Sequence, residues 1–480
     1  MAKHDLDPTD SPLAHIAKWA GQKPDILALR GPNLQLTWLE LNVQVHTLAA
    51  YFRDQRMTPG KGVVINATPE LARIYALAVL EAGLFSVVSP QLYAPERLLD
   101  AGFRYSVNTL DDQTFEGVRA IPIPATLGAN VSELGNSPRA IAGQEIVRVV
   151  LSSGTTGSPK AVPFTLKVLG ERIRSASIHN MREAPLLNLL GFNTASGNNA
   201  FFLDMYRGST HFIPGSPIYN LGLIQNGGIR GIACSPSSLE LLVRAAEKSS
   251  TKVRLELATS VGGFLSEKLL ARAKDCLGCD VVNIFASTEA GIVTHSDKES
   301  ADPLSPGHAY PGVDVKIFMA EDAELGEGVG EVGVKTPYQV HEYLADSEET
   351  ASRFRDGYFL SGDLGHVDDD GLLHLAGRSD DIINLHGQKI NPHLIESEAI
   401  SRFGLSEAVS VLATDQTGRQ FHVMLVVADQ PIDPIGIKQA LYSVFRTSAP
   451  QLITQCDSLP KNDMGKVMRR LAIKVNAPTN

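Results

Sequence analysis

The amino-acid sequence predicts an α/β protein whose parallel sheets are covered by helices, followed by a smaller domain of mixed α/β structure. Three observations support this prediction. Strand and helix patterns alternate over roughly the first 150 residues and recur further along the chain. Short strands and turns replace that alternation between about residues 306 and 375. After Gly377, about 100 residues return to a mixed pattern of helices and strands.

The clearest β-α-β unit lies between residues 63 and 88. The apolar run 63–65 predicts a buried strand, and Thr68 followed by Pro69 is typical of a helix N-terminus. Apolar side chains then recur on one helix face: Leu71, Ile74, Tyr75, Ala78 and Val79. Gly83 ends the helix, and residues 84–88 predict the next, parallel strand.

Later segments follow the same alternation. Residues 146–151 predict a strand, which leads through a Ser/Thr/Gly loop into a helix that begins near Thr165. A helix at 265–274 precedes a strand at 281–285. The sequence Asp369-Asp370-Gly371, between two short apolar runs, predicts a β-hairpin turn.

The composition excludes several classes of protein. The chain has 480 residues, of which 43% are hydrophobic and 20% charged, so it can bury a large core rather than remain disordered. Its 43 basic and 53 acidic side chains give a net charge of −10, which argues against nucleic-acid binding. No signal peptide is visible, and no apolar run reaches the length of a bilayer span. We therefore expect a cytoplasmic protein without stable membrane insertion.

A loop rich in serine, threonine and glycine follows the predicted strand at 146–151 directly. Its residues are Ser152, Ser153, Gly154, Thr155, Thr156, Gly157, Ser158, Pro159 and Lys160. Such a loop offers backbone N–H groups, hydroxyls and one ammonium to an anion, and its glycines let the anion approach closely. The spacing does not fit the Walker A pattern. After a buried strand, the loop predicts a phosphate site rather than an ordinary linker.

Four shorter motifs follow this loop in order. They span residues 283–289 (Asn-Ile-Phe-Ala-Ser-Thr-Glu), 361–363 (Ser-Gly-Asp), 377–381 (Gly-Arg-Ser-Asp-Asp) and 460–467 (Pro-Lys-Asn-Asp-Met-Gly-Lys-Val). Each motif alone is weak, since a single carboxylate or lysine in a turn is usually solvated. In this order and spacing, they resemble the adenylate-forming family, which includes acyl-CoA synthetases, peptide-synthetase adenylation domains and luciferase-like enzymes. The resemblance covers nearly the whole chain.

The resemblance implies a division into two domains. An N-terminal AMP-binding domain, built of parallel α/β subdomains and a distorted β-barrel, would cover residues 1–376. A hinge would follow at 377–380, in which Asp380 matches the hinge residue of the family. A small, mobile α+β domain would cover residues 381–480.

The resemblance also implies how ATP and Mg²⁺ would be bound. The loop from Ser152 to Lys160 would hold the β- and γ-phosphates, and Thr288 would contact the α-phosphate. Thr156 and Glu289 would help to hold Mg²⁺. The family pattern places the remaining nucleotide contacts at Gly262, Gly263, Asn283, Phe285, Ala286, Ser287, Asp363 and Arg378.

Among these contacts, Asn283 would bind the adenine amino group and Phe285 would stack on the ring. Asp363 would bind both ribose hydroxyls, assisted by Arg378. Lys466 matches the lysine that bridges the attacking carboxylate and the α-phosphate, where charge develops. With Thr288 and Glu289, it completes the predicted catalytic group.

In the second half-reaction of the family, the small domain rotates and a thiol attacks the acyl-adenylate. This implies a thiol channel formed in part by Gly387 and Lys389. The acceptor would be coenzyme A or the phosphopantetheine of a carrier protein.

Three positions bear on the acid that would be activated. Ala286 stands where the family usually has glycine, which predicts a somewhat narrower or shorter acyl pocket. Asn193 stands where many acyl-CoA synthetases have histidine and amino-acid-activating domains have aspartate, which argues against an amino-acid substrate. With Phe264, these residues predict a pocket for a small to medium carboxylic acid with a neutral tail.

Four functions remain open from the sequence. The first is an acid–CoA ligase, and the second is a free-standing enzyme that loads a carrier protein. The third is an inactive nucleotide-binding regulator, against which the presence of Lys466, Glu289, Asp363 and Arg378 argues. The fourth is luciferase-like oxidation, which explains no additional residue.

Overall fold

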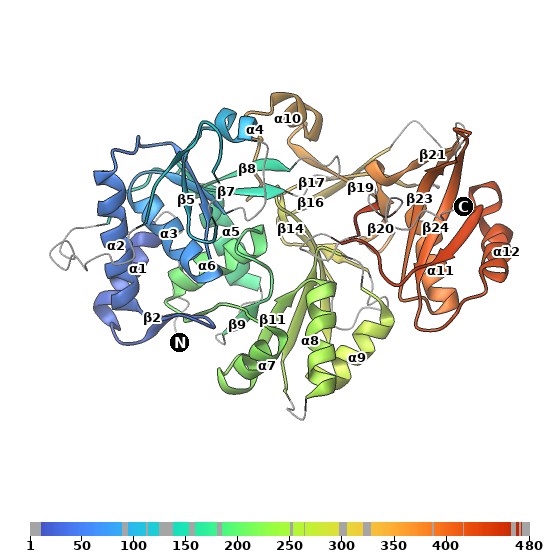
Figure 1. Ribbon diagram of the computed structural model, residues 1–480, viewed down its shortest axis with the longest axis horizontal. Coiled ribbons are helices and arrows are strands. Elements are labelled where there is room, and N and C mark those ends of the chain that lie inside the picture. The colour runs from blue at the N-terminus through green and yellow to red at the C-terminus, as the bar shows by residue number, and fades with distance from the viewer. Residues whose placement is uncertain are drawn as a thin grey trace. The chain divides into compact units, whose positions relative to one another are not determined.

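A computed structural model of the protein is shown in Figure 1. It describes residues 11–88, 95–111, 114–123, 138–152, 159–179, 185–249, 253–263, 265–296, 305–319, 328–385, 388–415, 417–461, 467–469 and 472. The chain forms two compact units. The first comprises residues 1–304, 310–313 and 335–359, and the second comprises residues 305–309, 314–334 and 360–480. The α/β class predicted from the sequence is confirmed, whereas the predicted domain boundary at residue 376 stays a prediction.

The first unit contains a six-stranded sheet in the order β6-β5-β3-β4-β7-β8. Neighbouring strands are parallel except for β7 and β8, which are antiparallel. The strands are β3 (Gly62–Asn66), β4 (Phe85–Val88), β5 (Phe103–Asn108), β6 (Arg119–Ala120), β7 (Ile146–Ser152) and β8 (Lys160–Thr165). Alternate residues of β3 enter two different hydrophobic clusters, so both faces of this strand are buried.

Helices cover this sheet, and their ends follow ordinary capping rules. Helix α3 begins after Thr68, whose hydroxyl accepts the N–H of Leu71 at 3.5 Å, as the sequence predicts. Figure 1 shows α2 and α3 lying against each other beside the sheet. The helices of this part are α1 (Pro12–Gln22), α2 (Trp38–Asp54), α3 (Pro69–Glu81), α4 (Pro95–Asp100), α5 (Leu166–His179) and α6 (Ala195–Arg207). A small sheet in the order β10-β1-β2 is formed by β1 (Leu27–Arg30), β2 (Gln35–Thr37) and β10 (His211–Phe212).

A second set of strands in the first unit pairs in the order β14-β13-β12-β11-β9. All are parallel except β14, which returns antiparallel to β13. The strands are β9 (Leu186–Asn188), β11 (Gly231–Cys234), β12 (Leu257–Val261), β13 (Val281–Ser287) and β14 (Gly291–His295). Helices α7 (Pro217–Asn226), α8 (Pro236–Lys248) and α9 (Glu267–Leu277) pack in sequence beside them, and α10 (Ser347–Arg353) and β18 (Phe354–Arg355) complete the unit (Figure 1).

The second unit begins with short strands, as the sequence predicts. They pair in the order β16-β17-β19-β20-β15 and are β15 (Gly307–Ala309), β16 (Asp314–Phe318), β17 (Gly330–Lys335), β19 (Tyr358–Val367) and β20 (Leu372–Arg378). The predicted hairpin turn at 369–371 joins β19 to β20. Asp368 Oδ1 accepts the N–H groups of Asp370 (3.0 Å) and Leu372 (2.8 Å), and Gly371 has φ +82°. The positive φ explains the glycine.

The remainder of the second unit is a small α+β body. Strands β23 (Glu407–Thr414), β24 (Gln420–Val427) and β25 (Leu452–Gln455) form one sheet, and β21 (Ile383–Leu385) pairs with β22 (Gln388–Ile390). Helices α11 (Pro392–Phe403) and α12 (Pro434–Phe445) share a hydrophobic core with this sheet. Two short 3₁₀ helices are η3 (Ser379–Asp381) and η4 (Arg446–Ser448).

One feature differs from the sequence analysis. The segment after the phosphate loop was expected to lead directly into a helix near Thr165, but strand β8 occupies residues 160–165 and only then does α5 begin. Ser152 pairs with Lys160 at the loop end of this β7–β8 hairpin. The two ends of the loop are therefore held side by side. Among the described residues, no helix is long and apolar enough to cross a membrane.

Candidate active site

The carboxyl ends of two parallel strands bring the predicted adenine-binding residues together. Val261, the last residue of β12, lies opposite Ile284 of β13, so Gly262 follows next to Phe285. Gly262 has φ +88°, which favours glycine and turns the chain away from the strand. Asn283 is buried, and Phe285 is partly exposed. The arrangement supplies an amide group and an aromatic face within one strand, as the resemblance implies for an adenine site.

Thr288 and Glu289 lie in the tight connection between β13 and β14. Ser287 Oγ accepts the N–H of Ala290 at 2.9 Å and closes this turn. Gly291 has φ +77°, and a Cβ there would come within 2.9 Å of the Tyr338 ring, so a larger residue would push the turn away from its support. The turn is thus fixed both by its own hydrogen bond and by packing.

The Glu289 carboxylate is buried, with 6% of the residue exposed. Tyr343 Oη donates a hydrogen bond to Oε1 at 3.0 Å. Burial raises the pKa of Glu289 above its usual value, while hydrogen bonds from Tyr343 and Ser152 and the charge of Arg172 act in the opposite direction. A carboxylate at the end of the predicted phosphate loop is consequently costly to keep ionised without a cation.

The carboxylate of Glu289 has the oxygen donors that Mg²⁺ prefers. A carboxylate has about four acceptor positions, and Tyr343 occupies one on Oε1. Mg²⁺ is commonly bound through one or two carboxylates together with substrate phosphates and water. A cluster of three or more His, Cys, Asp or Glu side chains is not found among the described residues. Glu289 would hold the ion with Thr156, and the ion when bound would neutralise phosphate charge.

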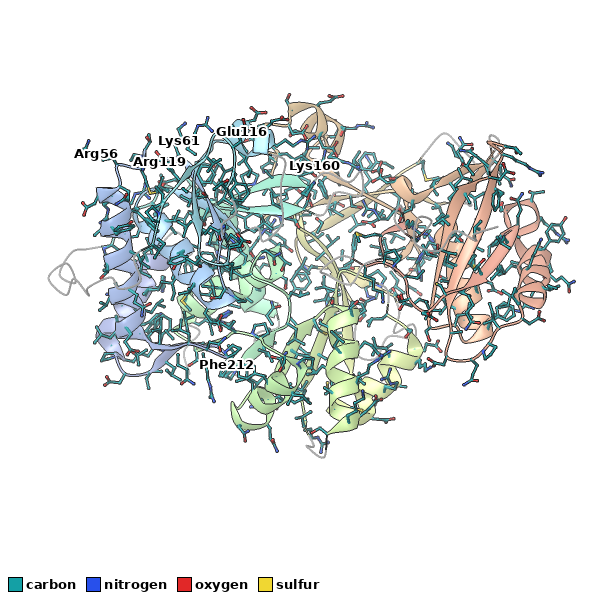
Figure 2. The ribbon with its side chains drawn as sticks, viewed as in Figure 1. Arg56, Lys61, Glu116, Arg119, Lys160 and Phe212 are labelled. Atoms are coloured by element: carbon teal, nitrogen blue, oxygen red, sulfur yellow. The ribbon has the colours of Figure 1, made fainter. Side chains whose placement is uncertain are left out.

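Lys160 has partners that the sequence analysis missed. Its ammonium is nearly buried and lies 3.1 Å from Glu349 Oε2 and 3.5 Å from Asp346 Oδ2. Asp346 is the N-cap of α10, and Glu349 lies in the first turn of that helix. Figure 2 shows Lys160 below α10. Its predicted role in binding the β- and γ-phosphates stays a prediction, since in this structure the ammonium is held by two carboxylates.

The predicted ribose site lies in the second unit. Asp363 of β19 faces Arg378 of β20 across the hairpin, and Arg378 Nη1 donates to Asp363 Oδ1 at 3.1 Å. Arg378 Nη2 donates to the Ser361 carbonyl at 3.2 Å, and the Asp363 N–H donates to Ser361 Oγ at 3.1 Å. The pair is partly exposed, with side-chain exposures of 17% for Asp363 and 23% for Arg378. An oriented carboxylate of this kind suits a pair of hydroxyl donors.

The predicted hinge follows directly. Gly377 has φ +128°, and a Cβ there would lie 2.9 Å from Asn391 Oδ1, so only glycine fits. Asp380 Oδ2 lies 3.6 Å from Arg378 Nη2.

Lys389, a predicted thiol-channel residue, pairs with Asn384 across β21 and β22. A hollow in this unit is lined by Leu364, Ser379, Ile382, Asn384 and Lys389.

Other predicted residues fall in different places. Asn193 is half-buried and immediately precedes Thr194, the N-cap of α6. It follows Phe192, whose ring is contacted by the guanidinium groups of Arg73 and Arg148. Ala286 and Ser287 end β13, and Gly263 lies against Pro236. Several predicted residues lie outside the described part of the chain: Ser153, Gly154, Thr155, Thr156, Gly157, Phe264, Gly387 and Lys466.

Two residues that support Glu289 were not predicted from the sequence, namely Tyr343 and Arg172. Arg172 had a visible signal. It falls on the apolar stripe of α5, between Leu169 and Ile173, which are both buried. A charged residue in such a position requires partners inside the protein. Tyr343 had no comparable signal.

Solved structures resemble the whole chain. ATP-bound MatB from Rhodopseudomonas palustris matches with a TM-score of 0.80 at 19% identity, covering 96% of this chain and 98% of that one. O-succinylbenzoate coenzyme A synthetase (MenE) from Bacillus subtilis, in complex with ATP and magnesium ion, matches with a TM-score of 0.78 at 20% identity, covering 96% and 99%. The fold is that of the adenylate-forming enzymes.

The family follows from the sequence comparison. The protein-family model described as "AMP-binding enzyme" matches residues 16–344 of the chain. The chain belongs to this family, that of the adenylate-forming ligases.

Curated relatives differ in what their names state. The chain is 26% identical to the fatty acid–[acyl-carrier-protein] ligase ScoC of Streptomyces coeruleorubidus, over 94% of this chain and 93% of that protein. It is 27% identical to the 2-succinylbenzoate–CoA ligase of Lactococcus lactis subsp. lactis (strain IL1403), over 73% of each. It is 25% identical to the hybrid PKS-NRPS synthetase TAS1 of Pyricularia oryzae (strain 70-15), over 93% of this chain and 28% of that larger protein.

Proposed function

We propose that the protein joins a small to medium carboxylic acid with a neutral tail to coenzyme A, at the expense of ATP. A carboxylate oxygen of the acid attacks the α-phosphorus of ATP. The bond between the α-phosphorus and the oxygen that bridges the α- and β-phosphates breaks. Acyl-adenylate and pyrophosphate are formed. The thiol of coenzyme A then attacks the acyl carbon, AMP leaves, and the thiol proton is released.

One observation supports the first half-reaction most directly. Glu289 is a buried carboxylate at the closed turn between β13 and β14, beside the end of the predicted phosphate loop at Ser152. Both reactants of this step are anions, so the barrier contains a large electrostatic part. Glu289 would supply the negative charge that keeps a cation at the phosphates, and Lys466 would supply positive charge at the reacting oxygens.

The residues predicted at the acyl pocket support a neutral tail. Asn193 supplies an amide rather than the carboxylate that an α-amino group would need. Ala286 adds a methyl group at the end of β13. These features favour an acid whose tail makes apolar contacts and at most one or two hydrogen bonds.

A second candidate acceptor is the phosphopantetheine thiol of a carrier protein. The fatty acid–[acyl-carrier-protein] ligase ScoC, which matches nearly the whole chain, supports this alternative. Coenzyme A and a carrier protein present the same thiol, so the same residues would serve both. An inactive regulator is disfavoured because Glu289 is buried and supported and Asp363 is paired with Arg378.

The test is pyrophosphate release from ATP and Mg²⁺ over a panel of carboxylic acids, with and without coenzyme A. Release with one class of acid, and multiple turnover only with coenzyme A, would support the ligase. Release with a trapped acyl-adenylate but no turnover with coenzyme A would favour carrier loading. The absence of release with every acid, together with measurable ATP binding, would leave two readings: an acid outside the panel, or the regulator.

The ribose site yields a separate prediction. Replacing Asp363 by Ala should lower kcat/KM for ATP by about 10²-fold, because two hydrogen bonds to a charged acceptor contribute about 1.5–3 kcal/mol each and part of this is recovered through water. The preference for ATP over 2′-deoxy-ATP should shrink in the same variant. Steady-state kinetics with both nucleotides measure this. The matched control is Asp369→Asn in the exposed turn of the same hairpin. An unchanged ATP preference in Asp363→Ala would remove Asp363 from the ribose site.

A further inference from the structure

Arg172 is a buried cation that binds to backbone rather than to a carboxylate. It lies on α5, and 4% of it is exposed. Its Nη2 donates to the carbonyl oxygens of Thr288 and Glu289, each at 2.9 Å. Two carbonyls of the same turn are thus held by one nitrogen, from a residue more than 100 positions away in sequence.

The same guanidinium connects this turn to a second segment. Arg172 Nε donates to the carbonyl of Tyr338 at 3.1 Å. The Val340 N–H donates to the Glu289 carbonyl at 3.0 Å, so the two segments are also bonded directly to each other. The guanidinium plane lies over the Phe164 ring of β8, with its carbon 4.2 Å from the ring centroid. Arg172 therefore fixes the turn, its support and the hairpin of the predicted phosphate loop at one point.

The charge of Arg172 matters as well as its geometry. Burial lowers its pKa to about 10, so it remains protonated at neutral pH. Its positive charge lowers the pKa of Glu289 against the effect of burial. Arg172 Nη1 is buried and has no hydrogen-bond partner among the described residues. A guanidinium can bind three carbonyls in fixed directions, which the single ammonium of lysine cannot reproduce.

We propose that Arg172 is a positioning residue that holds the Thr288–Glu289 turn in the geometry required to bind ATP with its Mg²⁺. The proposal rests on the proposed function, because it assigns Glu289 to the metal-bearing phosphates. Arg172 acts from behind the turn, through the two backbone carbonyls, and does not itself contact substrate. The side chain of Glu289 then needs only its own rotamer to be fixed, which Tyr343 provides.

The first test measures the turn without any ligand. Amide hydrogen exchange would be compared in the wild type, Arg172→Met, Arg172→Lys and the control Arg174→Met. Arg174 lies on the same helix, is exposed and pairs with Glu171. We expect exchange at Val340 and in the 286–291 segment to rise in Arg172→Met and, to a smaller extent, in Arg172→Lys. Arg174→Met should exchange as the wild type does.

The second test measures binding of ATP and Mg²⁺. The Kd for ATP at saturating Mg²⁺, and the Mg²⁺ concentration that gives half-maximal binding at fixed ATP, would be obtained by calorimetry. Loss of a group that orients a metal-binding residue typically weakens binding by about 10–100-fold, and we expect Arg172→Met to fall in that range. The affinity of Arg172→Lys for ATP and Mg²⁺ should lie between those of the wild type and Arg172→Met. The KM for the acid should not change in either variant.

The outcomes separate the positioning role from a purely structural one. Unchanged exchange and unchanged affinity in a folded Arg172→Met would overturn the proposal. If Arg172→Met does not fold, Arg172→Lys decides, and wild-type exchange and affinity in that variant would overturn it. A wild type that releases no pyrophosphate with any acid would refute the proposed function, whereas the exchange comparison would still decide whether Arg172 holds the turn.

Discussion

Replacing Glu289 by Gln should lower pyrophosphate release by about 10²–10³-fold and, at the same time, raise thermal stability. The loss is expected because the variant removes the negative charge proposed to keep a cation at the phosphates, in a site where one preorganised charge has an effect of that size. The gain is expected because the ionised carboxylate is buried and burial raises its pKa. Glutamine keeps the acceptor for Tyr343 Oη, so the hydrogen bond at 3.0 Å is preserved.

The pH dependence of the same variant gives an independent check. The pKa of Glu289 is higher in the folded than in the unfolded chain. At a pH between these two pKa values, the folded chain therefore keeps a proton on Glu289 that the unfolded chain has lost. The contribution of Glu289 to stability is therefore fully present below the unfolded pKa and is lost as pH rises through the folded pKa. Glu289→Gln should remove this loss. In the wild type, pyrophosphate release should fall on acidification at a higher pH than an ordinary glutamate would produce.

Scanning calorimetry and initial rates between pH 5 and 8 would measure both effects. A gain of about 1–2 °C in Tm at pH 7.5 corresponds to about 1 kcal/mol, because the unfolding entropy is about 2.1 cal/mol/K per residue and the unit that contains Glu289 has more than 300 residues. The matched control is Glu342→Gln, an exposed glutamate next to Tyr343, which should change neither quantity. A Glu289→Gln variant that is less stable at every pH, or fully active, would contradict the role proposed for this carboxylate.

Features that depend on local signals in the sequence were predicted best. The cap at Thr68 and the turn at Gly371 depend on neighbouring residues, and the structure confirms both. The single apolar face predicted for α3 was wrong, because the helix is buried almost all round and Leu71 is only partly buried. Strand β8 was missed because Pro163 argues against a strand, since proline cannot donate a ladder hydrogen bond. β8 is the last strand in its sheet order, and an edge strand tolerates this loss.

The candidate site shows the same division between local and distant signals. The ordered motifs predicted Thr288, Glu289, Asp363 and Arg378, and the structure places each pair on its own turn or hairpin. The partners of these residues were not predictable in the same way. Arg172 reaches the turn from a helix more than 100 residues earlier in the chain. Such contacts depend on how the chain folds back, and no spacing rule within the sequence encodes them.

Lys466, near the C-terminus, is expected to act in acyl-adenylate formation only. Replacing Lys466 by Ala should lower the rate of acyl-adenylate formation by about 10²–10³-fold, because the ammonium offsets the charge that develops between the attacking carboxylate and the α-phosphate. In the family that this chain resembles, the second half-reaction uses other residues, which line the thiol channel. Thioester formation from a supplied acyl-adenylate should therefore be retained in Lys466→Ala.

The chain offers a close control for this substitution. Lys461 lies five residues earlier in the same motif, and its Nζ pairs with Glu407 Oε1 at 2.8 Å. Its backbone pairs antiparallel with that of Val467. Removing a partly exposed ion pair of this kind costs about 0–1 kcal/mol, so Lys461→Ala should keep both half-reactions. Equal loss of adenylate formation in the two variants would indicate a general effect on this segment, whereas loss in Lys466→Ala alone, with thioester formation intact, would assign the first half-reaction to Lys466.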